Sequence, residues 1–162
     1  MNKKVVTPDR LAAITDTLRA QGRKLVLTNG CFDLLHVGHV RYLQAARALG
    51  DVLAVAINGD ESVRTLKGEG RPLIPENERT EIVTALECVN YVVIFPDVRV
   101  TELLSRVRPQ IYAKGGDYTA ETLNPKERTV LDEIGSEIRI LPFETGHSTS
   151  GLIEKMKKLP LP

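Results

Sequence analysis

Residues 24–49 read KLVLTNGCFDLLHVGHVRYLQAARAL, and this stretch decides the fold class. Its first part, from Lys24 to Thr28, is an apolar run without polar alternation, which is typical of a strand buried on both faces of a sheet. Its last part, from Val40 to Leu49, has the apolar spacing of an amphipathic helix. A strand that passes through a short polar turn into a helix predicts a parallel sheet with helical connections.

The rest of the chain repeats this alternation. Further strands are predicted at 52–57, 91–95, 110–113 and 137–141, and further helices at 76–89, 100–107, 125–134 and 148–159. A helix also opens the chain, with Thr7 as its N-cap, Pro8 in its first turn and Gly22 after its end. We expect a Rossmann-like α/β fold, a doubly wound five-stranded parallel sheet in the order 3-2-1-4-5 with helices on both faces. One domain is expected over residues 1–162, with the N-terminal helix in 1–22 and the core in 24–156.

The composition excludes several classes of protein. The 162 residues are 42% hydrophobic and 27% charged, as in globular domains, and 22 Lys and Arg against 21 Asp and Glu give a formal charge of +1. No overall field favours nucleic acid or a membrane surface, so a phosphate ligand needs local positive charge. Cys31 and Cys88 lack CxxC spacing, and no uncharged apolar run is long enough to span a bilayer. We expect a cytoplasmic protein that is neither exported nor embedded in a membrane.

Unusual polar residues and glycines follow four of the predicted strands. Because the carboxyl ends of parallel strands share one edge of the sheet, these clusters should meet there, at the switch point between the first and fourth strands. The clusters are Asn29, Gly30, Cys31, Phe32, Asp33, His36, Gly38 and His39; Asn58, Gly59 and Asp60; Lys114, Gly115, Gly116, Asp117 and Tyr118; and Gly146, His147, Ser148 and Thr149.

His36 and His39 stand three residues apart where the first connecting helix begins. Both imidazoles should face one side, beside backbone N–H groups at the positive end of the helix, and Gly38 leaves room for close approach of a phosphate. Two alternatives remain: the histidines act as helix caps, or they belong to a zinc site, for which further ligands are not evident.

The other clusters allow a functional and a structural reading. Gly115 and Gly116 permit close ligand approach after Lys114, and Asp117 could accept hydrogen bonds from sugar hydroxyls, but a plain turn between strand and helix has the same composition. Asp60 suits either a sugar hydroxyl or a helix cap. Cys31 is better explained by packing than as a nucleophile, because no base is fixed beside it.

The run TNGCFDLLHVGHVRYL resembles the HxGH signature of the cytidylyltransferase-like nucleotidyltransferases. Together with KGGDY at 114–118 and GHSTS at 146–150, it makes residues 24–156 similar to the adenylyltransferases of that family that make ADP-heptose. CTP-using relatives often carry arginine and threonine before the GxST element, whereas this chain has Phe143, Glu144 and Thr145. The resemblance therefore implies ATP as the nucleotide, in a stand-alone form without a kinase domain.

The resemblance also implies residue roles. The implied catalytic residues are His36, His39 and Lys67, with Lys67 on a mobile loop. The implied nucleotide-binding residues are Asn29, Gly30, Cys31, Phe32, Asp33, Gly38, Lys114, Gly115, Gly116, Gly146, Ser148 and Thr149. The implied substrate-binding residues are Asp60, Arg79, Asp117 and Tyr118.

The implied reaction transfers AMP from ATP to D-glycero-D-manno-heptose 1-phosphate, for lipopolysaccharide core or related glycan synthesis. The acceptor phosphate is already ionised near neutral pH, so no general base is required, and Mg²⁺ is expected with ATP, on ligands that the sequence does not identify. A homodimer is expected, with a separate heptose kinase and phosphatase in the pathway. The alternatives are a cytidylyltransferase or an adenylyltransferase that acts on another phosphate, such as glycerol 3-phosphate, phosphoethanolamine or flavin mononucleotide, or a non-catalytic nucleotide-sensing module.

Overall fold

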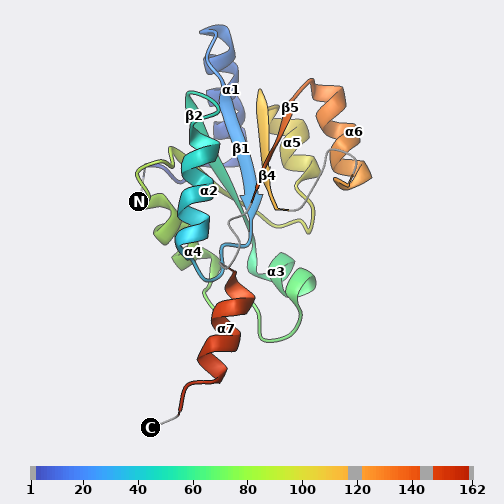
Figure 1. The fold of residues 1–162 in the computed structure, drawn as a ribbon. Helices are drawn as coiled ribbons and strands as arrows, with labels where there is room; N and C mark the ends of the chain where they lie inside the picture. The colour runs from blue at the N-terminus through green and yellow to red at the C-terminus, as the bar shows by residue number, and fades with distance from the viewer. Residues whose placement is uncertain (1–2, 117–121, 143–147, 161–162) are drawn as a thin grey trace.

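A computed structural model describes residues 3–116, 122–142 and 148–160 of the chain. Strands and connecting helices alternate after an N-terminal helix (Figure 1). In chain order the elements are α1 (Pro8–Ala20), β1 (Leu25–Gly30), α2 (Val37–Arg47), β2 (Val52–Asn58), α3 (Asp60–Lys67), α4 (Glu76–Thr84), β3 (Tyr91–Phe95), α5 (Thr101–Val107), β4 (Ile111–Gly115), α6 (Pro125–Ile134), β5 (Glu137–Leu141) and α7 (Thr149–Lys157).

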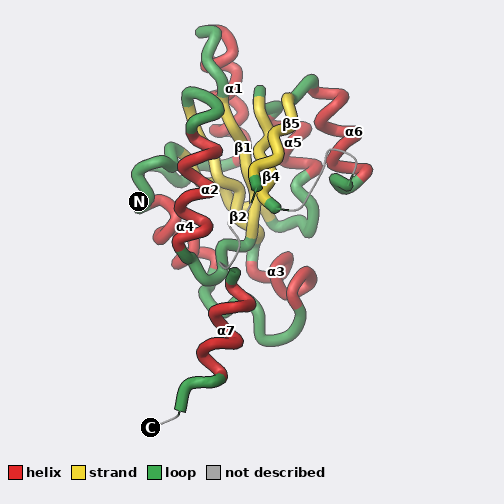
Figure 2. The backbone as a smooth tube through the Cα atoms, in the orientation of Figure 1, coloured by secondary structure: helices red, strands yellow, loops and turns green. Residues whose placement is uncertain are grey.

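The five strands form one parallel sheet in the order β3-β2-β1-β4-β5, so the predicted fold class and strand order are confirmed. Strand β1 lies at the centre, with β2 on one side and β4 on the other (Figure 2). The direction of winding reverses between β1 and β4, which makes their carboxyl ends the switch point of the sheet.

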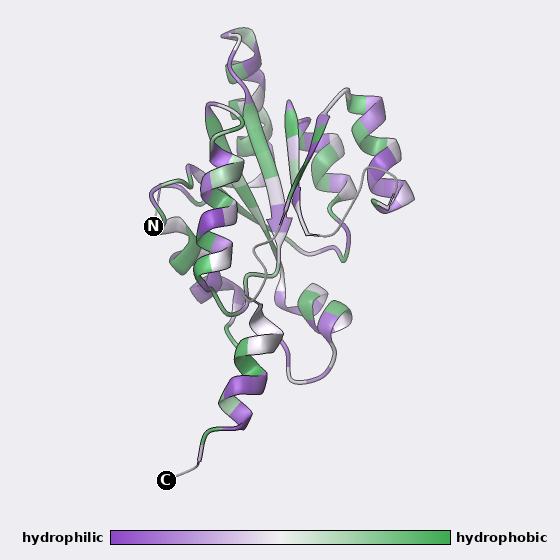
Figure 3. Cartoon of the chain, in the orientation of Figure 1, coloured by the Kyte–Doolittle hydropathy of each residue, from purple (hydrophilic) through white to green (hydrophobic). Residues whose placement is uncertain are grey.

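Helices cover both faces of the sheet, as the unbroken apolar strands predicted. Leu25 and Leu27 of β1 pack with apolar side chains of α1, α5 and α6, whereas Val26 packs on the opposite face with those of α2 and α4. All seven residues of β2 are buried. Figure 3 shows the resulting apolar centre, with the central strands largely green and purple segments on the surrounding helices.

Helix α1 begins as the sequence predicted: the Thr7 side chain accepts a hydrogen bond from the N–H of Arg10, and Pro8 occupies the first turn. It packs against α5 and β3, on the face of the sheet opposite α2. None of the helices in the described part of the chain has the length and apolar character that a membrane crossing requires.

Two of the sequence predictions about elements were wrong. Residues 60–67 form helix α3, which was not predicted, so Lys67 ends a helix instead of lying within a loop. Helix α4 ends at Thr84, although the apolar spacing predicted a helix through residue 89. After the helix, the Asn90 side chain accepts a hydrogen bond from the N–H of Leu53 where the chain enters β3 beside β2.

Candidate active site

A cavity of about 430 Å³ opens at the carboxyl edge of the sheet. The residues around it come from the ends of β1, β2 and β4, the starts of α2, α6 and α7, the end of α3, and the segments before α4 and α5. The described residues that line it are Asn29, Gly30, Cys31, Phe32, Asp33, His39, Tyr42, Asn58, Leu66, Lys67, Arg71, Val98, Arg99, Lys114, Gly115, Glu127, Thr149 and Ser150.

Ten of the sequence-predicted site residues lie on this cavity, including His39, Lys67 and Lys114. Six other predicted residues are described but do not line it: His36, Gly38, Asp60, Arg79, Gly116 and Ser148. Asp117, Tyr118 and Gly146 lie outside the described residues.

The cavity has the local positive charge that the sequence as a whole lacks. Among its described lining residues, four basic side chains, those of Lys67, Arg71, Arg99 and Lys114, face only two acidic ones. Arg71 and Arg99 carry no motif in the sequence, and only the fold brings them to this edge. The cavity is therefore suited to a polyanion such as a nucleoside triphosphate.

His36 is the N-cap of α2, and His39 is its third residue. The backbone N–H of His36 donates to Nδ1 of His39 over 3.3 Å, which closes part of a capping box, and the two rings lie 3.9 Å apart between centroids. A neutral imidazole that accepts at Nδ1 carries its proton at Nε2. His39 thus caps the helix with one nitrogen and keeps an N–H donor on the other.

The protonation state of His39 fits a donor role. Burial, followed by repulsion from His36, lowers the pKa of His39 from 6.5 to about 4, so the ring is neutral at pH 7. Its ring also packs at 5.4 Å from that of Phe32. Burial likewise raises the pKa of the Cys31 thiol, which keeps the thiol protonated and argues against a nucleophile there.

The turn after β1 is tightly packed around its glycine. Phe32 adopts a left-handed backbone conformation, with φ of 48°, and its ring folds back over Gly30. A Cβ atom on Gly30 would meet the Phe32 ring at 3.0 Å, closer than such atoms normally approach. Gly30 therefore allows the Phe32 ring to support His39.

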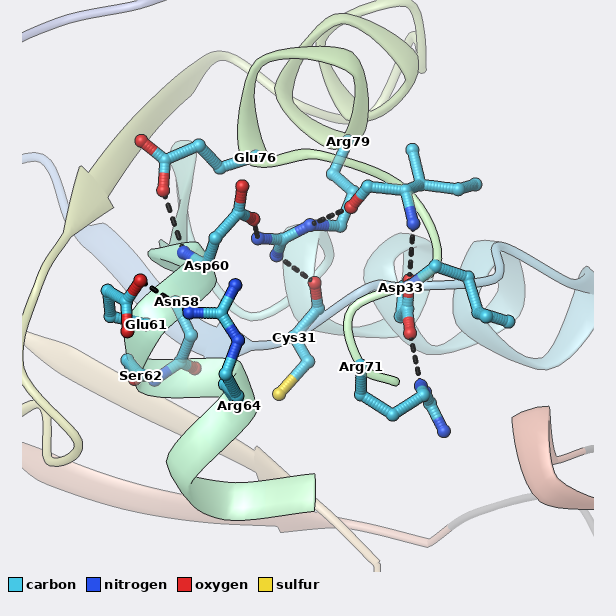
Figure 4. Close-up of polar contacts among 12 residues, drawn as sticks. Cys31, Asp33, Asn58, Asp60, Glu61, Ser62, Arg64, Arg71, Glu76 and Arg79 are labelled. Atoms are coloured by element: carbon cyan, nitrogen blue, oxygen red, sulfur yellow. Dashed lines mark hydrogen bonds and ion pairs between the residues drawn. The ribbon is translucent and has the colours of Figure 1, made fainter. Parts of the chain in front are cut away.

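Asp33 anchors the segment between α3 and α4. Its side chain is 1% exposed, and its carboxylate accepts from Arg71 Nε at 2.5 Å and from the backbone N–H groups of Leu73 and Ile74 at 2.8 and 3.0 Å (Figure 4). The carboxylate is thus fully engaged by the chain itself. Asp33 places Arg71 on the cavity wall.

Arg79 has a similar positioning role. Its side chain is fully buried and donates to the carbonyl oxygens of Ile74 and Cys31 and to the carboxylate of Asp60, as Figure 4 shows. Neither Arg79 nor Asp60 lines the cavity. Arg79 joins three segments, namely the turn after β1, the start of α3 and the segment before α4, so it orders the site without reaching its interior.

Lys114 extends from the end of β4 toward the buried Glu127 of α6. Its Nζ lies 3.8 Å from a carboxylate oxygen of Glu127 and 3.5 Å from the hydroxyl of Tyr112, which donates to Asn29 at 2.6 Å. Gly116 follows with φ of 121°, a conformation that favours glycine. Lys114 therefore lies within the last residues of β4, instead of in the turn predicted after that strand, and at the switch point of the sheet.

Helix α7 contributes hydroxyl groups to the same edge. Ser148 is its N-cap and accepts from the N–H of Gly151 at 3.0 Å, as expected for a residue that opens a helix. Thr149 lines the cavity and donates to the carbonyl oxygen of Leu34 at 3.3 Å, and Ser150 lines it as well. This contact ties α7 to the turn after β1.

The described residues do not supply a magnesium cage. They contain no cluster of three or more His, Cys, Asp or Glu side chains, and the two acidic groups on the cavity, Asp33 and Glu127, already face cations of the chain. Mg²⁺ commonly binds through substrate phosphates and water. Within the described residues, no zinc set is formed around the two histidines either.

The model of the Cytidylyltransferase-like family matches residues 27–155, a span that contains every segment of the cavity. The chain belongs to this family. It is 47% identical over 155 residues to the bifunctional protein HldE of Pelobacter propionicus and 49% identical over 154 residues to that of Geotalea uraniireducens. These matches cover 96% and 95% of this chain but 31% of each relative, so the chain spans about a third of their length.

Solved structures of this family's fold agree with the architecture. The lipopolysaccharide core biosynthesis protein of Thermoplasma volcanium superposes with a TM-score of 0.63 at 26% identity, covering 76% of this chain and 98% of that one. The pantoate-beta-alanine ligase of Francisella tularensis, with a TM-score of 0.60 at 14% identity, covers 91% of this chain and 69% of that one, and shares the fold.

Proposed function

We propose that this chain transfers AMP from ATP to D-glycero-D-manno-heptose 1-phosphate, giving ADP-heptose and pyrophosphate. The observation that carries the proposal is the basic cavity at the switch point of a cytidylyltransferase-like chain, with His39 at a helix N-terminus on its wall. A preorganised N–H donor beside basic side chains is what an α-phosphoryl group needs as charge develops on it.

The step is direct. An oxygen of the acceptor phosphate attacks the α-phosphorus of ATP, a new phosphorus–oxygen bond forms, and the bond to the bridging oxygen breaks as pyrophosphate leaves with the electron pair. The attacking oxygen is already ionised, since the second pKa of a phosphate monoester is about 6. The chain has to align the two phosphates and stabilise charge, through His39, Lys67 and the N-terminal amides of α2.

Charged reactants need neutralisation beyond what the chain provides. Four basic side chains among the described residues line a cavity that would hold a triphosphate and a second phosphate, so we propose that ATP enters as its magnesium complex. The ion supplies further charge neutralisation on the phosphates when bound. The residues of this chain hold and orient the phosphates around it.

The heptose acceptor is supported by relatedness. The KGGDY and GHSTS motifs resemble those of ADP-heptose-forming enzymes, the bifunctional HldE proteins match almost the whole chain, and a structural relative is a lipopolysaccharide core biosynthesis protein. A cytoplasmic location, a homodimer and a separate heptose kinase and phosphatase follow as parts of the same proposal.

A grid of nucleotides and acceptors tests this function. Pyrophosphate release is measured with ATP or CTP, each with heptose 1-phosphate, glycerol 3-phosphate, phosphoethanolamine and flavin mononucleotide. The proposal predicts much faster release with ATP and heptose 1-phosphate than with any other pair, because the chain lacks the arginine-bearing form of the GxST element. Equal or faster turnover with CTP, or with another acceptor, would contradict it. Nucleotide binding without pyrophosphate release would indicate a nucleotide-sensing module.

A further inference from the structure

Glu127 places two cations at one point of the cavity wall. Its side chain is 6% exposed and comes from α6, while Lys114 comes from the end of β4 and Arg99 from the segment before α5. One carboxylate oxygen lies 3.8 Å from Lys114 Nζ and the other lies 3.9 Å from Arg99 Nη1. Among the described residues, a single buried carboxylate thus faces two basic groups.

Both pairs are ionic contacts longer than hydrogen bonds. The carboxylate holds its negative charge beside both cations. Lys114 also donates to the hydroxyl of Tyr112 at 3.5 Å. The Arg99 side chain is also 49% exposed. Its planar guanidinium has the geometry for two parallel hydrogen bonds to a phosphate.

A second cavity, of about 340 Å³, begins at the same three residues. Arg99, Lys114 and Glu127 line both cavities, and the other described residues that line the second are 122–125, at the start of α6. Its volume is within the range of small-molecule sites. Thr122 and Asn124 add polar groups to it. A ligand that lies in the second cavity can therefore place one end at the wall of the first.

We propose that Arg99 and Lys114, held by Glu127, form the subsite for the phosphate of the acceptor, and that the second cavity takes its polyhydroxylated sugar. This assignment rests on the proposed function and names the place of its second substrate. The wall that the two cavities share puts the acceptor phosphate beside the first cavity, which holds the nucleotide. Attack on the α-phosphorus requires the acceptor phosphate to lie there. The positive charge offsets the repulsion between the two anions. Glu127 is a positioning residue for the pair.

The Arg99→Gln variant tests the subsite. Loss of a charge-assisted contact to a phosphate should raise the KM for heptose 1-phosphate about tenfold to a hundredfold and leave the KM for ATP within about twofold. Arg106→Gln is the matched control, because Arg106 is 50% exposed, lies on α5 and is ion-paired to Asp9 away from both cavities. Arg106→Gln should leave the KM for heptose 1-phosphate and the KM for ATP unchanged. An unchanged acceptor KM in Arg99→Gln, or a rise in both constants, would overturn the assignment.

A double-mutant cycle tests the role of Glu127. If the carboxylate acts by holding Arg99, the effect of Arg99→Gln on the acceptor KM should shrink to about threefold or less in the Glu127→Gln background. If the effects of Arg99→Gln and Glu127→Gln on the acceptor KM simply multiply in the double variant, Glu127 does not act by positioning Arg99. If Glu127→Gln fails to fold, as its melting temperature would reveal, the comparison of Arg99→Gln with Arg106→Gln decides the proposal alone.

The experiment separates this subsite from the proposed function. If the parent protein does not turn over heptose 1-phosphate, the proposed function fails, and the subsite is then tested by calorimetric titration of glucose 1-phosphate in the presence of a non-hydrolysable ATP analogue. Binding to the parent and to Arg106→Gln that is lost in Arg99→Gln supports a sugar-phosphate subsite. Equal binding to all three, or no binding to the parent, rejects it.

Discussion

His39 uses its two ring nitrogens for separate tasks. Nδ1 accepts the N–H of His36 and caps α2, while the neutral ring keeps its proton on Nε2 beside a cavity suited to phosphates. The two sequence-based interpretations, helix cap and phosphate ligand, are therefore compatible. A variant that keeps the cap and loses the second nitrogen distinguishes the tasks.

His39→Gln is that variant, because glutamine at the third helical position can accept the N–H of the N-cap residue. We expect a melting temperature close to that of the parent, ATP affinity within several-fold, and a kcat lower by about 10²-fold or more. Thermal unfolding, ATP titration and steady-state rates on one preparation measure all three. A stable variant with the kcat of the parent would remove His39 from the catalytic residues.

The pH dependence of stability gives a second test at His39. Its pKa in the folded chain, about 4, is below the ordinary value of 6.5 because burial disfavours the charged ring. Between these values the unfolded chain takes up a proton that the folded chain does not, so this contribution is constant above pH 6.5 and is lost as the pH falls toward 4. As the pH falls over this interval, the free energy of unfolding of the parent should therefore decrease more steeply than that of His39→Gln. The difference in slope corresponds to at most one additional proton bound on unfolding. Parallel curves would contradict the buried, neutral ring.

At the scale of elements, the segment from α3 to α4 shows what sequence reasoning could not provide. Residues 60–67 include only two strongly apolar side chains, Val63 and Leu66, so their pattern predicted no helix. The helix forms against the body of the protein, where Ser62 donates to the carbonyl oxygen of Asp97 at 2.9 Å. Such contacts join residues far apart in the chain, as does the pairing of Asp33 with Arg71. By contrast, strands with unbroken apolar runs and helices with caps, such as β2 and α1, were predictable because their signals are local.

The same limit applies to the site. Glycines and histidines after strand ends identified the edge of the sheet, since chain direction alone places them there. Arg71, Arg99 and Glu127 carry no local pattern and reach the cavity only through tertiary packing. Arg79 was expected from resemblance to contact substrate, and the structure places it in a buried network behind the cavity.

The anchoring of this segment predicts the effect of Asp33→Asn. The amide would keep one acceptor for the N–H groups of Leu73 and Ile74 and lose the charge that Arg71 faces. We expect a loss of about 1–3 kcal/mol in the free energy of unfolding, measured by urea denaturation, and a raised KM for ATP. Asp132→Asn is the control, because the exposed ion pair between Asp132 and Arg128 contributes little to the free energy of unfolding. An Asp33 variant as stable as this control would show that the segment is held by other contacts.

At the scale of the whole molecule, the sheet organises both stability and function. The two apolar layers on its faces meet at every strand, and α1 is part of one of them through Leu11 and Leu18. We propose that residues 1–162 fold as one unit, so heat should produce a single transition with equal calorimetric and van't Hoff enthalpies. Separate melting of the N-terminal helix would contradict one domain.

The central claim is that this sheet edge transfers AMP to a heptose phosphate. The most direct test follows a mixture of the protein, ATP, magnesium and D-glycero-D-manno-heptose 1-phosphate by ³¹P nuclear magnetic resonance. We expect ADP-heptose and pyrophosphate to appear together in equal amounts as ATP and the sugar phosphate decline. Formation of AMP with unchanged heptose phosphate, or no change in the spectrum of a folded protein that binds ATP, would contradict it.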